Sequence, residues 1–191
     1  MKITSAVFVK SATENENLIR DELPQIAFIG RSNVGKSTLI NTLTNNKKLV
    51  RHSSKPGSTQ EINFFTINNA YYFVDLPGYG YAKGPFEKRS LITERIQGYL
   101  FDTEIIHHTI VLIIDARVGM TESDQDMFRE LLEQEKHIVI IANKIDQLNQ
   151  SEKHKNLKAI EAMASPYPVI PFSSTKRIGI EKLFDVLFGE V

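Results

Sequence analysis

The sequence predicts an α/β fold: a single domain built on a mostly parallel sheet of about six or seven strands, with one antiparallel hairpin strand and helices on both faces. Two observations predict it. Apolar runs typical of buried strands alternate with helical patterns along the 191 residues, which is the pattern of βαβ units. Two of these runs flank Asn68-Asn69, and asparagine tolerates the positive φ that a tight hairpin turn requires.

The individual elements follow from the positions of the apolar residues. Strands are predicted at residues 4–9, 25–29, 62–67, 70–75, 109–114, 138–142 and 169–172. Helices are predicted at residues 36–43, 85–100, 122–133, 151–164 and 180–188. The polar stretch 11–22 is predicted to be a loop. We expect residues 1–22 to add a strand and a loop to the same domain that residues 23–191 form, because no stretch has the composition of a linker.

The composition excludes several classes of function. Basic and acidic residues number 23 each, so the net charge gives no global reason to expect binding to nucleic acid or membranes. The chain has no cysteine, which excludes disulfides, thiolate catalysis and cysteine-bound metals. No apolar run approaches the roughly 20 residues that a membrane-spanning helix needs. We expect a monomeric cytoplasmic protein without membrane contact.

A glycine-rich stretch lies between the strand at 25–29 and the helix at 36–43. The segment Gly30-Arg31-Ser32-Asn33-Val34-Gly35-Lys36-Ser37 matches the pattern G-x-x-x-x-G-K-[ST] of a phosphate-binding P-loop. Glycines allow backbone N–H groups to surround phosphate oxygens, and the N-terminus of the following helix attracts negative charge. Lys36 would reach the β- and γ-phosphates of a nucleotide, and Ser37 would offer its hydroxyl to Mg²⁺.

The residues after the strand at 138–142 discriminate between bases. Asn143-Lys144-Ile145-Asp146, here called the guanine motif, lies at the carboxyl edge of the sheet, where ligands bind in such folds. The carboxylate of Asp146 can accept hydrogen bonds from the ring N–H and the amino group of guanine, whereas adenine would leave that charge unpaired. Lys144 could lay its stem over the base, and Asn143 could bind the P-loop. Ser173, Ser174 and Thr175 follow the last strand, where a backbone N–H can bind the base carbonyl.

Two further segments are typical of loops that respond to a nucleotide. Asp75-Leu76-Pro77-Gly78 ends the second hairpin strand; its carboxylate can hold a water on Mg²⁺, and the N–H of Gly78 can meet a γ-phosphate. Gly57-Ser58-Thr59-Gln60-Glu61 precedes the hairpin, and its Thr59 is the expected second hydroxyl ligand of Mg²⁺. Loops that γ-phosphate and Mg²⁺ order, and that hydrolysis releases, form a two-state switch. The predicted metal ligands are therefore Ser37, Thr59 and Asp75.

Together and in this order, the motifs resemble those of the TRAFAC-class GTPases. The P-loop with Thr38-Leu39-Ile40-Asn41, and the run Asp75-Leu76-Pro77-Gly78-Tyr79-Gly80-Tyr81-Ala82, are similar to the EngB family, also called YihA or YsxC. The resemblance spans nearly the whole chain and implies a P-loop GTPase domain that hydrolyses GTP to GDP with Mg²⁺. It also implies a role in assembly of the large ribosomal subunit and in normal cell division and septation. Many relatives carry Thr at the position of Asn143, although Asn is the commoner residue across GTPases.

The sequence lacks the residue that positions the attacking water in many GTPases. Many GTPases carry Gln after the Asp-x-x-Gly motif, but Tyr79 stands there, so we expect slow intrinsic hydrolysis. Asn33 resembles the residue that binds a cation in potassium-activated GTPases, and a hydrogen bond within its own loop is an equal alternative. Gln60 is another candidate for contact with the nucleotide. The residues expected to act on the terminal phosphate are Lys36, Thr59, Gly78 and Asn33.

A basic stretch precedes Thr59 and suggests a partner. It comprises Lys47, Lys48, Arg51, His52 and Lys55 without an acidic residue, and Lys83, Lys88 and Arg89 could extend it. Such a cluster attracts phosphates, although a solvated loop is the ordinary alternative. With the resemblance, it suggests binding to the large ribosomal subunit or its precursors through ribosomal RNA.

Two other functions compete with a GTP-hydrolysing switch. One is an assembly module whose binding to ribosomal particles depends on the bound nucleotide and whose stand-alone hydrolysis is negligible. The other is a phosphotransferase acting on a small molecule, which the guanine motif and Thr59 disfavour. Release of free phosphate without transfer to an acceptor would exclude the phosphotransferase.

Overall fold

The seven-stranded sheet is the centre of the fold. The computed structural model describes residues 1–50, 61–80 and 86–189, and within them the strands have the order β1-β3-β4-β2-β5-β6-β7. The strands are β1 (Ala6–Ala12), β2 (Gln25–Gly30), β3 (Ile62–Ile67), β4 (Tyr71–Asp75), β5 (His107–Asp115), β6 (Ile138–Asn143) and β7 (Val169–Pro171). The described pairs are parallel except those that β3 makes with β1 and β4. The predicted sheet with one antiparallel hairpin strand is confirmed.

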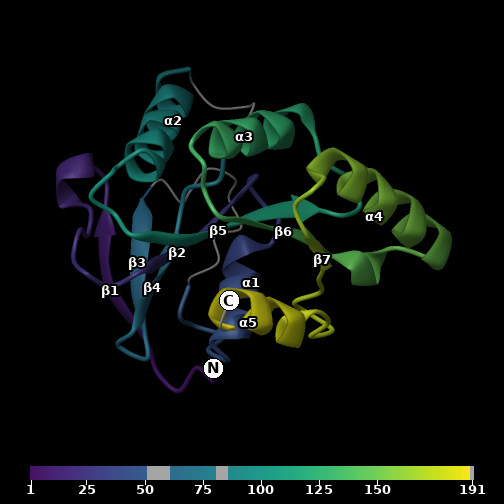
Figure 1. The fold of residues 1–191 in the computed structure, drawn as a ribbon, viewed down its shortest axis with the longest axis horizontal. Helices are drawn as coiled ribbons and strands as arrows, with labels where there is room; N and C mark the ends of the chain where they lie inside the picture. The colour runs from purple at the N-terminus through teal and green to yellow at the C-terminus, as the bar shows by residue number, and fades with distance from the viewer. Residues whose placement is uncertain (51–60, 81–85, 190–191) are drawn as a thin grey trace.

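Helices cover both faces of the sheet (Figure 1). They are α1 (Lys36–Leu43), α2 (Phe86–Leu100), α3 (Glu122–Glu133), α4 (Gln150–Ala164) and α5 (Ile180–Phe188). Helices α2, α3 and α4 lie over one face, and α1 and α5 lie over the other. Short 3₁₀ turns occur at Asn15–Asn17 and Ile145–Gln147. The predicted two-sided arrangement is therefore present.

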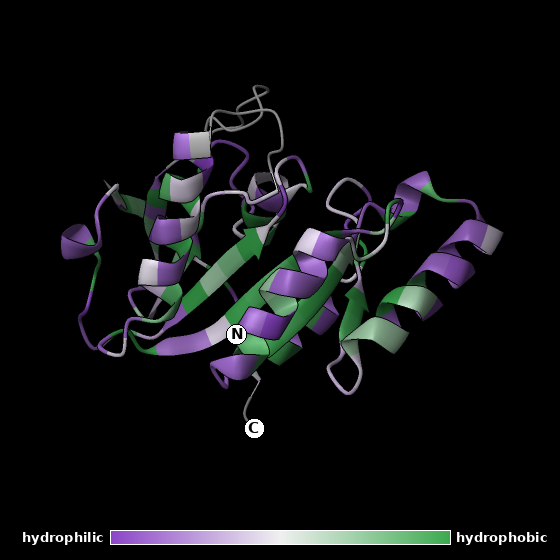
Figure 2. Ribbon diagram, turned by 90° about the horizontal axis from the view of Figure 1, so that it is seen from above, coloured by the Kyte–Doolittle hydropathy of each residue, from purple (hydrophilic) through white to green (hydrophobic). Residues whose placement is uncertain are grey.

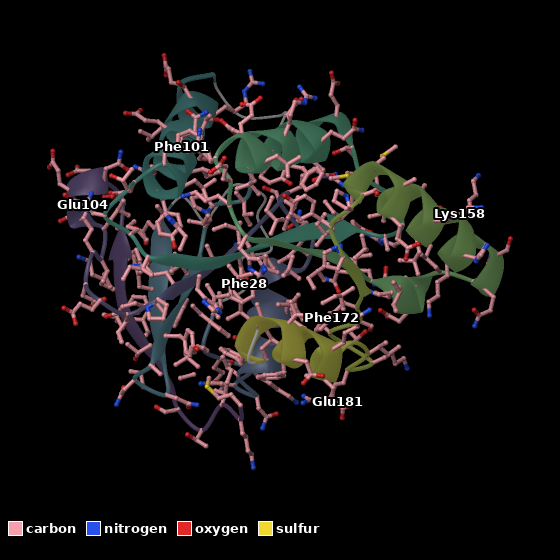
Figure 3. All side chains as sticks on the ribbon, in the orientation of Figure 1. Phe28, Phe101, Glu104, Lys158, Phe172 and Glu181 are labelled. Carbon is pink, nitrogen blue, oxygen red and sulfur yellow. The ribbon has the colours of Figure 1, made fainter. Side chains whose placement is uncertain are left out.

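Strand β5 shows why two apolar layers form. Ile110, Leu112 and Ile114 face the layer with α2, α3 and α4, and Val111 and Ile113 face the layer with α1 and α5. The sheet is accordingly apolar, and the outer faces of the helices are polar (Figure 2). Burial of each such side chain contributes about 1.5–3 kcal/mol. In Figure 3, Phe28 and Phe172 lie among the interior side chains, whereas Lys158 and Glu181 project outward.

The hairpin between β3 and β4 has the expected asparagines at its tip. Asn68 and Asn69 have φ of 51° and 53°. The N–H of Ala70 donates to the carbonyl of Ile67 at 2.9 Å. Because Ala70 closes the turn in this way, β4 begins at Tyr71 and not at the predicted Ala70.

The N-terminal strand is longer than predicted. Ser11 and Ala12 pair with Asn63 and Ile62 of β3, and the Ser11 hydroxyl donates to Oδ1 of Asn63 at 2.7 Å. The prediction of a loop over residues 11–22 is therefore wrong at its start, because a polar edge residue can pair in a sheet without an apolar pattern. The other predicted elements are present with slightly shifted ends.

Candidate functional site

The candidate site lies at the carboxyl edge of the parallel strands. A hollow of about 280 Å³ opens there, and its lining comprises Arg31, Ser32, Asn33, Val34, Gly35, Lys36, Ser37, Thr38, Gly78 and Lys144. We call it the P-loop hollow. Most of its wall comes from the segment between β2 and α1, and the rest comes from the segments after β4 and β6. The sheet topology thus brings together three motifs that are far apart in the sequence.

The P-loop has a backbone that its glycines make possible. Gly35 has φ of 102° and precedes the first turn of α1, and a side chain on it would collide with Nδ2 of Asn143. A Cβ on Gly30 would lie 2.6 Å from the backbone oxygen of Ile113 on β5. Asn33 also has a positive φ, of 65°. Glycine is therefore required at both ends of the loop, for conformation at Gly35 and for close packing at Gly30.

Lys36, which lines the P-loop hollow, forms a buried ion pair with Asp75. Their side chains are 8% and 1% exposed, so removal of either partner would leave an uncompensated charge. The second carboxylate oxygen of Asp75, Oδ2, is buried and has no hydrogen-bond partner among the described residues. The pair joins the start of α1 to the end of β4. Lys36, predicted to reach phosphates, thus also contacts the carboxylate predicted to serve the metal.

The guanine motif contacts the P-loop directly. Nδ2 of Asn143 donates to the carbonyl of Val34 at 3.0 Å, which is the kind of contact expected from the sequence. Lys144 has a left-handed backbone with φ of 66°, and its Nζ donates to the carbonyl of Asn33 at 2.6 Å. Ile145 is 2% exposed and packs in the core, so its side chain faces away from the hollow's edge. Two neighbouring residues of the motif thereby fix the outer turn of the P-loop.

Asp115 is a site residue that the sequence prediction missed. It ends β5 and lies 2.8 Å from Nζ of Lys144 and 2.6 Å from Nη2 of Arg117. Burial alone would raise its pKa, but hydrogen bonds from Arg117 and Lys144 outweigh that effect and lower the pKa to about 2. A carboxylate directly after a buried apolar strand is the signal that pointed to Asp75, and it applies equally to Asp115.

Asp146 is held by the loop between β7 and α5. The hydroxyl of Thr175 donates to Oδ2 of Asp146 at 2.9 Å. The Ser173 hydroxyl first, and then that of Thr175, lower the pKa of Asp146 below its usual range, so the side chain is ionised at neutral pH. Oγ of Ser174 is buried without a hydrogen-bond partner in the described part of the chain. Of the three predicted residues after the last strand, Ser173 and Thr175 thus contact Asp146 of the guanine motif.

The segment after β4 lies against the P-loop. The N–H of Ser32 donates to the carbonyl of Tyr79 at 3.1 Å, and a Cβ on Gly78 would come within 3.1 Å of the Ser32 backbone. The hydroxyl of Tyr79 donates to Asp124 of α3 at 2.8 Å. The side chain of Tyr79 is therefore hydrogen-bonded to α3. Leu76 and Pro77, predicted to contact nucleotide, are buried.

Several predicted residues fall outside the described residues. They are Arg51, His52, Lys55, Gly57, Ser58, Thr59, Gln60 and Lys83. Glu61 is described and exposed, directly before β3. Lys47 and Lys48 are exposed as well, and the backbone beside them is held by Asn41 of α1, whose Oδ1 accepts from the N–H of Val50 at 2.8 Å. The start of the basic stretch is therefore anchored to the helix that follows the P-loop.

Metal binding and membrane insertion can be assessed for the described part of the chain. Residues 1–50, 61–80 and 86–189 contain no cluster of three His, Asp or Glu side chains able to hold a metal ion. None of the helices that the structure describes is long and apolar enough to cross a membrane.

Comparison with known proteins also indicates a site for a guanine nucleotide. Residues 25–144 match a family described as "50S ribosome-binding GTPase". The chain is 45% identical over 188 residues to "Probable GTP-binding protein EngB" of Prosthecochloris aestuarii, covering 98% of this chain and 97% of the relative. It is 40% identical over 189 residues to the protein of the same name from Lactobacillus gasseri, with 97% of each covered. A "Crystal structure of a probable GTP-binding protein engB" superposes with a TM-score of 0.71 at 28% identity, covering 86% of this chain and 96% of that one.

Proposed function

The chain belongs to the EngB family of GTP-binding proteins and is a GTP hydrolase, and from this premise we propose that it is a nucleotide-controlled switch in assembly of the large ribosomal subunit. The observation that carries the proposal is the match of residues 25–144, which contain the P-loop, the Asp75–Gly78 segment and the first two residues of the guanine motif, to a family described as ribosome-binding. We infer that the protein acts in the cytoplasm as a monomer, and that its loss would impair cell division and septation.

The described contacts support specific roles around GTP and GDP. The backbone N–H groups of the P-loop would surround the phosphates, with Lys36 supplying a positive charge beside them. Asp146, ionised and held by Thr175, would accept two hydrogen bonds from guanine. Asn143 and Lys144 hold the P-loop turn through Val34 and Asn33, so base and phosphate subsites would be rigidly linked. Ser173 and Ser174 would contact the base carbonyl.

The residues present fit a magnesium ion. Asp75 has a buried carboxylate oxygen without a partner among the described residues, and Ser37 lies in the wall of the P-loop hollow. Together with Thr59, these side chains offer the hard oxygen ligands that Mg²⁺ prefers. When bound, the ion would neutralise charge on the β- and γ-phosphates.

Hydrolysis would depend on few protein groups. Lys36 and the N–H of Gly78 would stabilise charge on the terminal phosphate. The Tyr79 hydroxyl is directed to Asp124, so it would not orient water, and slow intrinsic turnover is expected. Asn33 could hold a potassium ion through its side-chain amide oxygen, since Nζ of Lys144 donates to its backbone carbonyl, at 2.6 Å.

The hydrogen bond from Tyr79 to Asp124 also favours a second candidate function. In it, the protein is an assembly module whose ribosome binding depends on nucleotide and whose stand-alone hydrolysis is negligible. The two functions share one site. They differ in turnover of the isolated protein, which would be measurable for the first and close to the uncatalysed rate for the second.

Lys47 and Lys48 are the described residues that we propose contact ribosomal RNA. Both are exposed, and neither forms an ion pair with another described residue. The test is binding of the full chain to purified large subunits across a salt series. Lys47→Ala with Lys48→Ala should weaken binding and reduce the salt slope by about 1 per lysine. Lys155→Ala with Lys158→Ala, an equal loss of charge on α4, is the control; equal behaviour of the two double variants would contradict this contact.

A further inference from the structure

Asp124 on α3 is a buried carboxylate that joins three segments. It is 0% exposed and accepts hydrogen bonds from Nε of Arg31 at 3.0 Å and from the hydroxyl of Tyr79 at 2.8 Å. The N–H and hydroxyl of Thr121 donate to it at 2.9 and 2.7 Å, which caps the start of α3. A capping residue needs only the local bonds. The bonds from Arg31 and Tyr79 are therefore additional; Arg31 lines the P-loop hollow, and Tyr79 directly follows Gly78, which also lines it.

The backbones of these two walls are also joined at the same place. Arg31 and Tyr79 form an isolated parallel bridge, and the N–H of Ser32 donates to the Tyr79 carbonyl. Gly80 has φ of 71°, and a Cβ there would lie 3.2 Å from Cγ of Arg31. The stem of Arg31 thus packs against the chain directly after Tyr79. One side chain of α3, that of Asp124, thus contacts both the P-loop and the residue directly after Gly78.

We propose that Asp124 is a positioning residue, which acts through Tyr79 and Arg31 to hold Gly78 against the P-loop where its N–H meets the terminal phosphate of GTP. The inference rests on the proposed role of Gly78. GDP lacks that phosphate, so the clamp formed by Arg31, Tyr79 and Asp124 contributes to binding of GTP and not to binding of GDP. Preorganised donors of this kind avoid reorganisation when the ligand binds.

The hydrogen bond between Tyr79 and Asp124 is shielded from solvent, which strengthens it. Burial first, and then the charge of Asp124, raise the pKa of Tyr79 well above its usual range, so its hydroxyl keeps its proton and remains a donor. The partner is a carboxylate, and hydrogen bonds to charged groups are stronger than neutral ones. Loss of the Tyr79 hydroxyl is therefore expected to lower the affinity for GTP, the binding that depends on the clamp, about tenfold.

The test compares affinities for GDP and for a non-hydrolysable GTP analogue in the full chain. Tyr79→Phe and Asp124→Asn should each lower affinity for the analogue about tenfold while leaving affinity for GDP within about twofold. The matched control is Tyr72→Phe, because Tyr72 also donates from its hydroxyl to a carboxylate, Asp21, at 2.6 Å. Combining Tyr79→Phe with Asp124→Asn should cost less than the sum of the two single changes, because Tyr79→Phe removes the donor of one bond and Asp124→Asn removes the charge of its acceptor.

Three results would overturn the proposal. Unchanged affinities for both nucleotides in Tyr79→Phe, which keeps the ring and its packing, would remove the role of the hydroxyl. Equal losses for GDP and for the analogue would indicate general support of the fold. Additive effects in the double variant would show that Tyr79 acts independently of Asp124. A wild-type chain that binds neither nucleotide would instead contradict the proposed function, which distinguishes the two failures.

Discussion

Replacing Asp146 with asparagine should exchange guanine for xanthine as the preferred base. An ionised Asp146 can accept from the ring N–H and the 2-amino group of guanine. Asparagine retains one acceptor but presents an amide N–H₂, which repels the amino group of guanine. Xanthine carries an oxygen in place of that amino group and can accept from the amide. The same change therefore weakens GTP and strengthens the xanthine nucleotide.

The structure limits the size of the effect. Asp146→Asn would lose the bond from the amino group of guanine and would weaken the bond from the ring N–H to a neutral one; a hydrogen bond to a charged group is worth about 1.5–3 kcal/mol and a neutral one about 1 kcal/mol. Because Asp146 is exposed, the lower value is appropriate for the charged bonds, and the total loss is about 2 kcal/mol. At about 1.4 kcal/mol per tenfold change, GTP affinity should fall roughly thirtyfold.

Equilibrium titration with fluorescent GDP, competed by GTP, xanthosine triphosphate or ATP, measures these changes. Asp126→Asn, which removes an exposed carboxylate on α3, should leave all affinities unchanged. If Asp146→Asn kept wild-type selectivity for GTP over the xanthine nucleotide, Asp146 would not contact the base, and the assignment of the guanine motif would be wrong.

Three further predictions concern packing, pH and cations. Gly30→Ala should lower the free energy of unfolding by at least about 2 kcal/mol, because its Cβ would lie 2.6 Å from a backbone oxygen of β5. Gly119→Ala, where φ is 82° but no atom lies within 4 Å, should lower it by only about 1 kcal/mol. Urea titration measures both losses, and a larger loss in Gly119→Ala than in Gly30→Ala would contradict the packing argument. Burial first, and then Lys136, lower the pKa of His107 from 6.5 to about 4. The unfolded chain therefore binds the proton first, and stability should fall by up to about 3 kcal/mol as pH drops from 6.5 to 4; a His107→Gln variant with the same pH profile would refute this. If the side chain of Asn33 holds a potassium ion, GTP turnover should be faster in potassium than in sodium, and equal rates in the two salts would refute the cation hypothesis.

The sequence predicted those features that depend on local pattern. Alternating apolar runs predicted which segments form strands. The residues that end β2, β4 and β6 lie at one edge of the sheet because parallel strands share a carboxyl edge. The contact from Asn143 to the P-loop follows from that geometry. Asp115 obeys the same rule and could have been predicted, since it ends an equally apolar strand.

The clamp formed by Arg31, Tyr79 and Asp124 could not be predicted in the same way. Arg31 and Asp124 are separated by 93 positions, and their contact depends on how α3 packs on the sheet. The local pattern at Thr121 and Asp124 indicates a helix cap, which explains the carboxylate without any distant partner. The ion pair between Lys36 and Asp75 also depends on tertiary structure. The sequence assigned Lys36 to the phosphates and Asp75 to the metal, and their mutual contact appears only when β2 and β4 lie side by side.

The proposal of a nucleotide-controlled ribosome switch is tested most directly by co-sedimentation of the full chain with purified large ribosomal subunits. The chain would be loaded with GDP or with a non-hydrolysable GTP analogue at one fixed salt concentration. We expect the analogue-bound protein to sediment with the particles and the GDP-bound protein to remain largely in the supernatant. Equal sedimentation in the two states, or none in either, would contradict the switch.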